Sequence, residues 1–190
     1  MARQPKRTYQ LKITLKGAKP PIWRRVLVPS DIRLDQLHLV IQLVMGWLDC
    51  HLHQFEAQGV FFGVPDNDFG EDMGVEDESK VKLHDLLTRE KQSISYEYDF
   101  GDGWEHQIML EQVLPYDKEE ALPVCIKGKR ACPPEDCGGV WGYAALLKVL
   151  ADPADPEHES MLEWVGGPFD AEEFDERAAN FALSGLQNRS

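Results

Sequence analysis

The segment ISYEYDFGDGWEHQIML, residues 94–110, carries the clearest strand signal in the chain. Apolar and polar residues alternate on both sides of Gly101-Asp102-Gly103, which is the pattern of strands that bury one face. Glycine adopts backbone conformations that other residues avoid, so Gly-Asp-Gly is typical of a turn. The segment therefore predicts a central β-hairpin. Its apolar face is predicted to hold Ile94, Tyr96, Tyr98, Phe100, Trp104, His106, Ile108 and Leu110.

The first quarter of the chain predicts two strands followed by a helix. Residues 9–15 alternate in polarity, and residues 22–28 form the returning strand after a break that contains Gly17 and two prolines. Residues 34–48 place apolar side chains at three- and four-residue steps, which predicts a helix that ends near Gly46. The opening unit is therefore strand–strand–helix.

The remaining segments complete an α+β fold. We expect short strands at 51–58 and 60–62, a loop at 63–80, a helical turn within 81–88, an irregular segment at 115–139, and helices at 143–150, 157–165 and 172–186. The prediction is a mixed or antiparallel sheet that opens with strand–strand–helix, contains the central hairpin and has the C-terminal helices packed beside it. We expect a single domain, 1–190, with a core at 9–183 and disordered ends at 1–8 and 187–190.

The composition of the 190 residues is that of a globular protein, with 43% hydrophobic and 28% charged residues. No apolar run approaches the roughly 18 residues that span a bilayer. The basic N-terminus is not followed by the apolar core of a signal peptide. These features predict a cytoplasmic protein without a membrane partner. In a reducing compartment the four cysteines, including Cys50, are expected to be free thiols or metal ligands rather than disulfides.

The formal net charge of −13 is unevenly distributed. Residues 1–48 hold nine Lys and Arg against two Asp, and the rest of the chain is strongly acidic. An acidic molecule repels a phosphate backbone, which disfavours nonspecific nucleic-acid binding by the whole surface. The basic first hairpin can still contact an acidic partner, an unknown protein or a nucleic acid, and Arg24 and Arg25 are the predicted partner-binding residues. Alternatively, these charges only solvate an exposed sheet face.

Several spaced motifs together resemble a known family. They are Ile22-Trp23-Arg24-Arg25, Leu37-His38, Gly46-Trp47, His51-Leu52-His53-Gln54-Phe55, residues 98–106, and Cys132-Pro133-Pro134-Glu135-Asp136-Cys137-Gly138-Gly139 with Gly142-Tyr143. In this order they resemble the Ri-plasmid ORF-three-like family (the plasmid pRiA4b type), some members of which are labelled passenger proteins of insertion elements. The resemblance implies an α+β fold with a sheet that carries the first helix. It implies no reaction, because a link to mobile elements describes genetic context and not chemistry.

Histidines and cysteines form one set of candidate metal ligands. Cys125, Cys132 and Cys137 lie in one predicted loop, and His53 and His106 lie in the predicted sheet. Zinc takes four nitrogen or sulfur ligands, usually from closely spaced pairs, and the Cys132–Cys137 spacing is wider than the usual pair. Zinc or another divalent metal is therefore one interpretation of these residues. The other is that the cysteines are small buried hydrophobic residues and the histidines are hydrogen-bonded core residues.

Carboxylates form a second set, with Asp102, Glu135 and Asp136 as candidate catalytic residues. Two prolines stiffen the loop that carries the last two. If this loop packs over the hairpin, these carboxylates and His106 converge around a divalent cation or activate a water. Alternatively, Asp102 belongs to ordinary turn chemistry, and Glu135 and Asp136 cap a helix that begins near Trp141.

Two functions follow from these patterns. No Walker A, G-x-S-x-G or G-x-G-x-x-G motif is present, so the commonest NTPase, hydrolase and dinucleotide-binding classes lose support. The leading hypothesis is an uncharacterised intracellular binding or accessory module, associated with mobile-element or nucleic-acid-handling systems. The alternative is a metal-dependent hydrolase that uses the His, Cys and carboxylate cluster.

Overall fold

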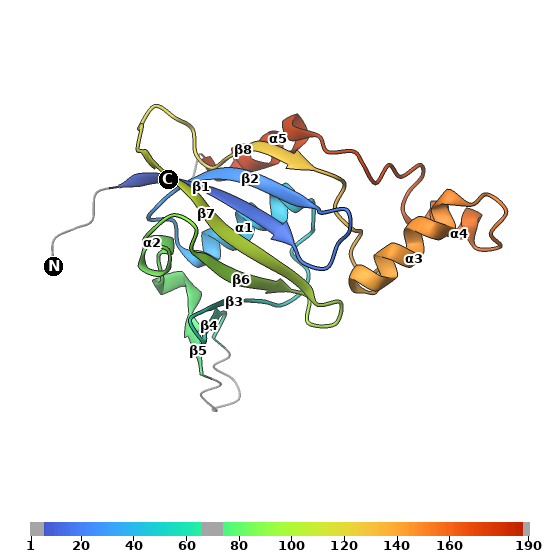
Figure 1. Cartoon of the computed structure of the whole chain (residues 1–190), viewed down its shortest axis with the longest axis horizontal. Helices are drawn as coiled ribbons and strands as arrows, with labels where there is room; N and C mark the ends of the chain where they lie inside the picture. Colours follow the sequence, from blue (N-terminus) through green and yellow to red (C-terminus); the bar gives the residue numbers. More distant parts are fainter. Residues whose placement is uncertain (1–5, 66–73, 188–190) are drawn as a thin grey trace.

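The computed structural model describes residues 6–65 and 74–187, and its centre is one eight-stranded sheet (Figure 1). The strand order is β5-β4-β3-β6-β7-β1-β2-β8. All neighbouring strands run antiparallel except β4 and β5, which are parallel. The strands are β1 (Arg7–Leu15), β2 (Trp23–Pro29), β3 (His53–Ala57), β4 (Val60–Gly63), β5 (Val75–Asp77), β6 (Ser93–Tyr98), β7 (Trp104–Pro115) and β8 (Val124–Lys129). The predicted α+β class and mixed sheet are confirmed.

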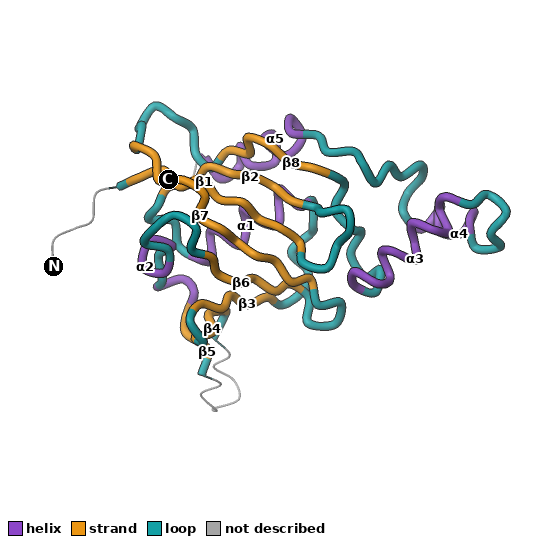
Figure 2. Tube along the Cα trace, viewed as in Figure 1, coloured by secondary structure: helices purple, strands orange, loops and turns teal. Residues whose placement is uncertain are grey.

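Helices lie on one face of the sheet and beside it (Figures 1 and 2). They are α1 (Leu34–Met45), the 3₁₀ turn η1 (Glu78–Lys80), α2 (Leu83–Leu86), α3 (Gly139–Ala151), α4 (His158–Trp164) and α5 (Glu176–Gln187). Helix α1 crosses the sheet, and α5 packs against α1 and β8. Helices α3 and α4 lie beyond the turn that joins β6 to β7. Among the described residues, no helix has the length and apolar character that crossing a membrane requires.

The core lies between α1 and the sheet, because only that face of the sheet is covered. Leu11 and Ile13 of β1 are fully buried, as are Leu37 and Ile41 on the facing side of α1. The residues between them in β1, such as Lys12, point to the opposite face and stay partly exposed. An antiparallel sheet with one solvent-exposed face shows this alternation, which is why period-two patterns predicted the strands.

The central hairpin is confirmed, with Tyr98 opposite Trp104 and Tyr96 opposite His106. The predicted inward position of Phe100 is wrong, because its side chain is 50% exposed. Asp99 adopts a left-handed backbone conformation with φ of 56°. This residue ends the strand early, so the alternation that would have turned Phe100 inward stops.

Three boundaries differ from the sequence prediction. The segment 115–139 was predicted to be irregular, but it contains the edge strand β8, whose register with β2 shifts between Arg25 and Val26. That shift breaks the period-two pattern. The loop predicted at 63–80 contains β5 and η1, and its residues 66–73 lie outside the described residues. Arg7 and Thr8 belong to β1, and Gln187 belongs to α5, although the ends were expected to be disordered. Residues 1–5 and 188–190 lie outside the described part.

Arg24, a predicted partner-binding residue, is instead buried under α1 with 2% of its surface exposed. Its Nε donates to the carbonyl oxygen of Val44 at 2.7 Å, and its Nη1 donates to those of Trp23 and Lys129 at 3.0 and 3.1 Å. The guanidinium also lies 4.1 Å from the ring centroid of Phe174. Carbonyls of the last turn of a helix attract cations. Arg24 therefore joins the end of α1 to the edge of the sheet and is not available to a partner.

We expect Arg24→Ala to lower the free energy of unfolding by about 2–4 kcal/mol, because it leaves buried carbonyl oxygens without a donor and opens a cavity. Urea titration followed by tryptophan fluorescence measures this loss. The control is Lys127→Ala, which removes an exposed cation from the same sheet edge and is expected to cost less than about 0.5 kcal/mol. Equal losses in the two variants would contradict the structural role of Arg24.

Candidate functional site

The candidate site forms where three segments meet at one end of the sheet. These are the link from α1 to β3 (residues 46–52), the β6–β7 turn (residues 99–103), and the cysteine loop (residues 132–138). The indole Nε1 of Trp47 donates to the carbonyl oxygen of Pro133 at 3.0 Å. The backbone N–H of Gly138 donates to Asp102 Oδ2 at 3.1 Å. The cysteine loop therefore packs over the hairpin.

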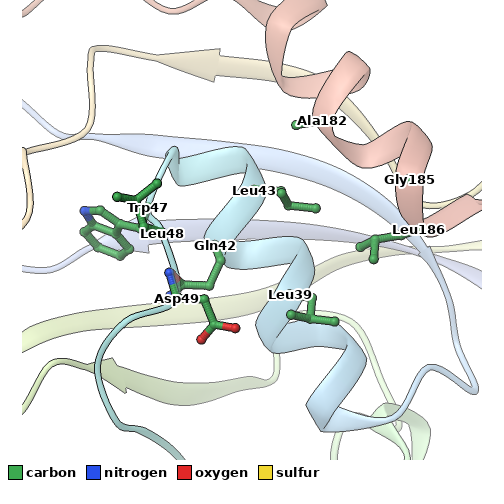
Figure 3. Close-up of a pocket in the computed structure, with 9 residues that line it drawn as sticks. All are labelled: Leu39, Gln42, Leu43, Trp47, Leu48, Asp49, Ala182, Gly185 and Leu186. Carbon is green, nitrogen blue, oxygen red and sulfur yellow. The ribbon is translucent and has the colours of Figure 1, made fainter.

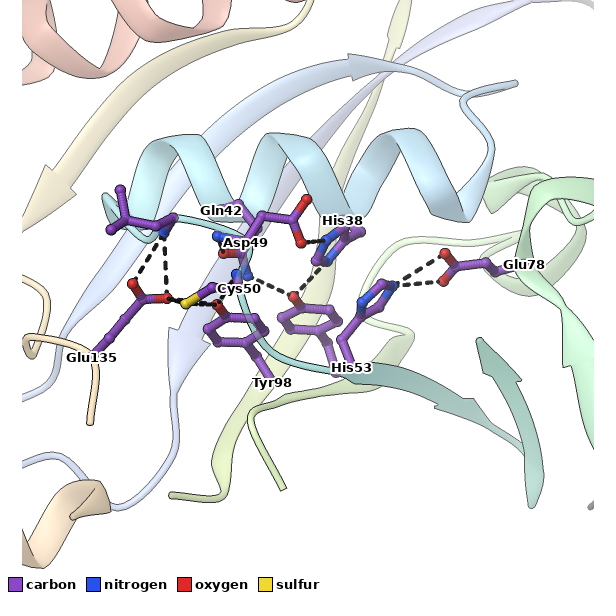
Figure 4. A network of polar contacts seen from close by, with 10 residues as sticks. His38, Gln42, Asp49, Cys50, His53, Glu78, Tyr98 and Glu135 are labelled. Atoms are coloured by element: carbon purple, nitrogen blue, oxygen red, sulfur yellow. Dashed lines mark hydrogen bonds and ion pairs between the residues drawn. The ribbon is translucent and has the colours of Figure 1, made fainter. Parts of the chain in front are cut away.

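Glu135 fastens the cysteine loop to the sheet (Figure 4). Its Oε1 accepts a hydrogen bond from the Tyr98 hydroxyl at 2.5 Å, and its carboxylate accepts from the backbone N–H of Leu48 at 3.3 Å. The same hydroxyl accepts from the backbone N–H of Cys50 at 3.0 Å. Burial, and then the bond to Glu135, raises the pKa of Tyr98, so the phenol keeps the proton that it donates.

His51 lies between two carboxylates from different segments. Its Nε2 is 3.3 Å from Asp136 Oδ1 and 3.7 Å from Asp99 Oδ2. Neither contact has hydrogen-bond geometry, and this nitrogen is buried without a hydrogen-bond partner among the described residues. Asp99 and Asp136 both have left-handed backbone conformations, with φ of 56° and 58°. Aspartate tolerates this region better than most residues, which explains the residue type at both turns.

A buried histidine pair lies deeper under α1 (Figure 4). The rings of His38 and His53 are stacked, with centroids 3.5 Å apart and planes 5° from parallel. His38 contacts the Tyr96 hydroxyl at 2.8 Å and Asp49 Oδ1 at 2.7 Å. His53 Nε2 lies 2.9 and 3.1 Å from the two carboxylate oxygens of Glu78. Burial, and then the neighbouring His53, lowers the pKa of His38.

The five predicted metal ligands are not brought together. His53 is bonded to Glu78, and His106 lies in the core beside the rings of Trp47 and Tyr96. Cys125 is in β8, whereas Cys132 and Cys137 are in the cysteine loop. Within the described residues, no three of these side chains place ligand atoms within 4.8 Å of one another.

The thiols of this set are also poorly suited to metal binding. Burial raises the pKa of Cys125 to about 11 and that of Cys137 to about 12, and it raises the pKa of Cys132 as well. A metal ligand is the thiolate, so each of these groups would have to lose a proton from an environment that disfavours its charge.

The three predicted catalytic carboxylates share this end of the sheet but have different neighbours. Asp102 accepts from Gly138, the residue before α3, and so takes the place at the helix start that was considered for Glu135 and Asp136. Glu135 is bonded to Tyr98, and Asp136 faces His51. Sequence reasoning chose His53 and passed over His51, because the choice between them depends on the backbone turn at Asp49, where φ is 56°.

The family model described as "Plasmid pRiA4b ORF-3-like protein" matches residues 7–178. The chain belongs to this family. This pRiA4b ORF-3-like chain is 42% identical over 174 residues to the uncharacterized protein y4hQ of Sinorhizobium fredii (strain NBRC 101917 / NGR234), a match that covers 91% of the chain and 86% of y4hQ.

A crystal structure with the same fold exists for a protein of unknown function, MM3350 from Methanosarcina mazei Go1. It superposes with a TM-score of 0.82 at 40% sequence identity, covering 92% of the pRiA4b ORF-3-like chain and 98% of MM3350. The relatives are uncharacterised, so the function has to be argued from the site.

A hollow of about 310 Å³ lies between α1 and α5 (Figure 3). Its lining residues are Leu39, Gln42, Leu43, Trp47, Leu48, Asp49, Ala182, Gly185 and Leu186. Its apolar residues lie beside two polar ones, Gln42 and Asp49, which also belong to the hydrogen-bond network around His38. Gln42 Nε2 donates to the Tyr96 hydroxyl at 3.0 Å, and the backbone N–H of Asp49 donates to Gln42 Oε1 at 3.1 Å.

The uncovered face of the pRiA4b ORF-3-like sheet carries a second candidate surface, which we call the Trp23 face. It consists of Lys12, Trp23, Arg25, Lys127 and Lys129. Lys12 and Arg25 lie 5.1 and 5.2 Å from the Trp23 ring centroid. Lys127 is paired with Arg25, and Lys129 with Trp23, and paired residues of neighbouring strands point to the same face. Arg25, unlike Arg24, therefore lies on a surface that a partner can reach.

His106 makes the stability of the pRiA4b ORF-3-like fold dependent on pH. Burial lowers its pKa to about 4, although backbone groups of Trp104 and Tyr96 act in the opposite direction. Within the described residues, neither ring nitrogen makes a hydrogen bond of regular geometry. Unfolded histidine titrates near 6.5. Between about pH 6.5 and 4 the unfolded chain therefore binds a proton that the folded chain does not. The free energy of unfolding is therefore highest above about pH 6.5, and it decreases as the pH falls through this window.

We expect His106→Leu to weaken this pH dependence. The difference in unfolding free energy between pH 7 and pH 4.5 should be smaller than in the unmodified protein by about 2–3 kcal/mol. Urea titrations at the two pH values give that difference. His158→Gln, which changes a histidine outside the core, serves as the control and should behave as the unmodified protein. An unchanged pH dependence in His106→Leu would exclude His106 as its source.

Proposed function

We propose that this chain is a noncatalytic binding module that holds single-stranded nucleic acid on the Trp23 face. The observation that supports the proposal is an indole surrounded by cations on the uncovered side of a sheet. Proteins that bind single strands combine a basic surface, which follows the phosphates, with aromatic rings on which bases stack. The sheet supplies both on neighbouring strands.

The charges of the Trp23 face are not all compensated. Arg25 forms a two-point ion pair with Glu111, with Nε and Nη2 at 2.6 and 2.9 Å from its two carboxylate oxygens. Within the described residues, neither Lys127 nor Lys129 forms an ion pair, and both are exposed. The rest of this acidic chain repels phosphate, so its field favours contact at this face over contact elsewhere.

The same proposal places the protein in the cytoplasm, in a mobile-element or nucleic-acid-handling system. All four cysteines, Cys50, Cys125, Cys132 and Cys137, are free thiols, which fits a reducing cytoplasmic compartment. A module that holds single strands suits a mobile-element or nucleic-acid-handling system, because strand exchange exposes such strands.

We expect the double variant Lys127→Glu/Lys129→Glu to bind a fluorescein-labelled single-stranded DNA or RNA 15-mer at least about tenfold more weakly than the unmodified protein at low salt. Each phosphate contact that is lost should also reduce the slope of log K against log salt by about 0.7. Fluorescence anisotropy measures both quantities.

The matched control is Lys118→Glu/Lys148→Glu, which makes the same charge change at exposed positions away from the Trp23 face. Its affinity should stay within about twofold of the unmodified protein. If both double variants lose affinity equally, the loss reflects the net charge of the protein and not the Trp23 face. If the unmodified protein binds neither oligonucleotide, the proposal is refuted.

A metal-dependent hydrolase is the second candidate function. The observation that favours it is the position of His51 between Asp99 and Asp136, with a carboxylate oxygen of Glu135 within 4.8 Å of a His51 ligand atom. A metal held there would lower the pKa of a bound water, and Glu135 is the candidate base.

If the chain is a hydrolase, the protein with one equivalent of Zn²⁺ should hydrolyse p-nitrophenyl acetate or bis-p-nitrophenyl phosphate, and His51→Ala should abolish the reaction. Release of p-nitrophenolate, followed by absorbance, gives the rate. Cys125→Ser changes a thiol of β8 outside this cluster and should keep the full rate. Equal rates in the unmodified protein and in His51→Ala would eliminate this candidate.

A further inference from the structure

We propose that His51, Asp99 and Asp136 form a binding site for a divalent transition-metal ion, with Zn²⁺ as the expected ion. One ligand atom of each residue lies within 4.8 Å of those of the other two. The three ligands lie in loops at one end of the sheet rather than on the Trp23 face. The proposed metal site therefore stands whether or not the chain binds nucleic acid or hydrolyses a substrate.

The spacing of the ligand atoms fits a metal ion. Zinc lies about 2.0–2.1 Å from nitrogen and oxygen ligands in a tetrahedral arrangement, which places neighbouring ligand atoms about 3.3 Å apart. His51 Nε2 is 3.3 Å from Asp136 Oδ1 and 3.7 Å from Asp99 Oδ2. Both carboxylates are therefore nearly at the separation that a shared ion would impose.

The buried nitrogen of His51 provides an independent observation. In the part of the chain that the structure describes, His51 Nε2 has no hydrogen-bond partner, although two carboxylates lie beside it. A buried imidazole nitrogen without a hydrogen bond is costly, because it has lost its contact with water. A cation between the three side chains would bind the lone pair of Nε2 and both carboxylates at once, and its two positive charges would balance the two aspartates.

Contacts that do not use the ligand atoms hold each ligand in place. Asp99 Oδ1 accepts from the backbone N–H of Gly101 at 2.9 Å, which leaves Oδ2 toward His51. The His51 ring packs edge-on against Tyr98, with centroids 5.7 Å apart. Asp136 follows Glu135, which is bonded to Tyr98 and Leu48. Such supporting contacts orient metal ligands and raise affinity.

The ligand types select the class of ion. An imidazole nitrogen with two carboxylates suits zinc and similar transition metals, whereas Ca²⁺ and Mg²⁺ favour oxygen ligands alone. Three protein ligands leave the fourth position of zinc for water. The side chain of Asp136 is 71% exposed, so an ion can reach the site from solvent.

A neighbouring group, Cys50, His51 and Glu135, also has ligand atoms within 4.8 Å of one another. The other two members are already engaged, because Glu135 accepts from Tyr98 and Leu48, and the Cys50 thiol points to Glu135 at 3.5 Å. Binding a metal there would require several hydrogen bonds to break. We therefore assign the ion to the Asp99 and Asp136 side of His51.

Isothermal titration of the untagged, EDTA-treated full chain with Zn²⁺ tests the assignment. The unmodified protein should bind one equivalent with micromolar or tighter affinity, and His51→Ala and Asp136→Asn should each weaken binding at least about 100-fold. Asp136 is exposed, so Asp136→Asn should keep the circular dichroism spectrum and urea midpoint of the unmodified protein.

Two further variants locate the ligands. Cys50→Ser and Cys132→Ser should bind Zn²⁺ as the unmodified protein does, and millimolar Mg²⁺ should not compete. The proposal fails if the unmodified protein binds no stoichiometric Zn²⁺, if Asp136→Asn binds Zn²⁺ normally, or if Cys50→Ser abolishes binding.

Discussion

Arg24 and Arg25 are neighbours in the chain but lie on opposite faces of the sheet, and the covering of only one face by helices gives them different roles. The covered face has to be apolar or internally bonded, so the guanidinium of Arg24 is held by carbonyl oxygens at the end of α1. The other face meets water, so Arg25 pairs with Glu111 beside an aromatic ring. The same constraint separates the buried histidine pair from the Trp23 face.

Hydrogen bonds to Glu135 connect this layered sheet to the candidate metal site. Glu135 of the cysteine loop lies 37 residues after Tyr98 in sequence, and Tyr98 and Leu48 hold this loop where Asp136 meets His51. A carboxylate with several donors is an effective anchor for this loop, because charge-assisted hydrogen bonds are stronger than neutral ones. The geometry at His51 thus depends on contacts made by the adjacent residue.

Sequence predicted the parts of the fold that repeat and missed the parts that depend on single backbone turns. The central hairpin and α1 follow from regular periodicity, and the family resemblance from spaced motifs was correct. Strand β8 was missed because a register shift interrupts its alternation. The convergence of Glu135 and Asp136 on the hairpin was anticipated, but the partner histidine was not. The backbone conformation of Asp49 sets which side chains of the link from α1 to β3 point toward the site, and the amino-acid sequence pattern does not reveal that conformation.

The buried network under α1 has a fixed direction of proton donation. A carboxylate only accepts, so His38 Nε2 carries the hydrogen that Asp49 receives, and neutral His38 must accept at Nδ1 from Tyr96. Gln42 then donates to Tyr96 and accepts from the backbone of Asp49, which closes the circuit. Every member donates the same way around the ring, and such chains polarise one another. A second proton on His38 would leave the Tyr96 hydroxyl without its acceptor and break this closed chain of hydrogen bonds. The network therefore selects a single tautomer of His38.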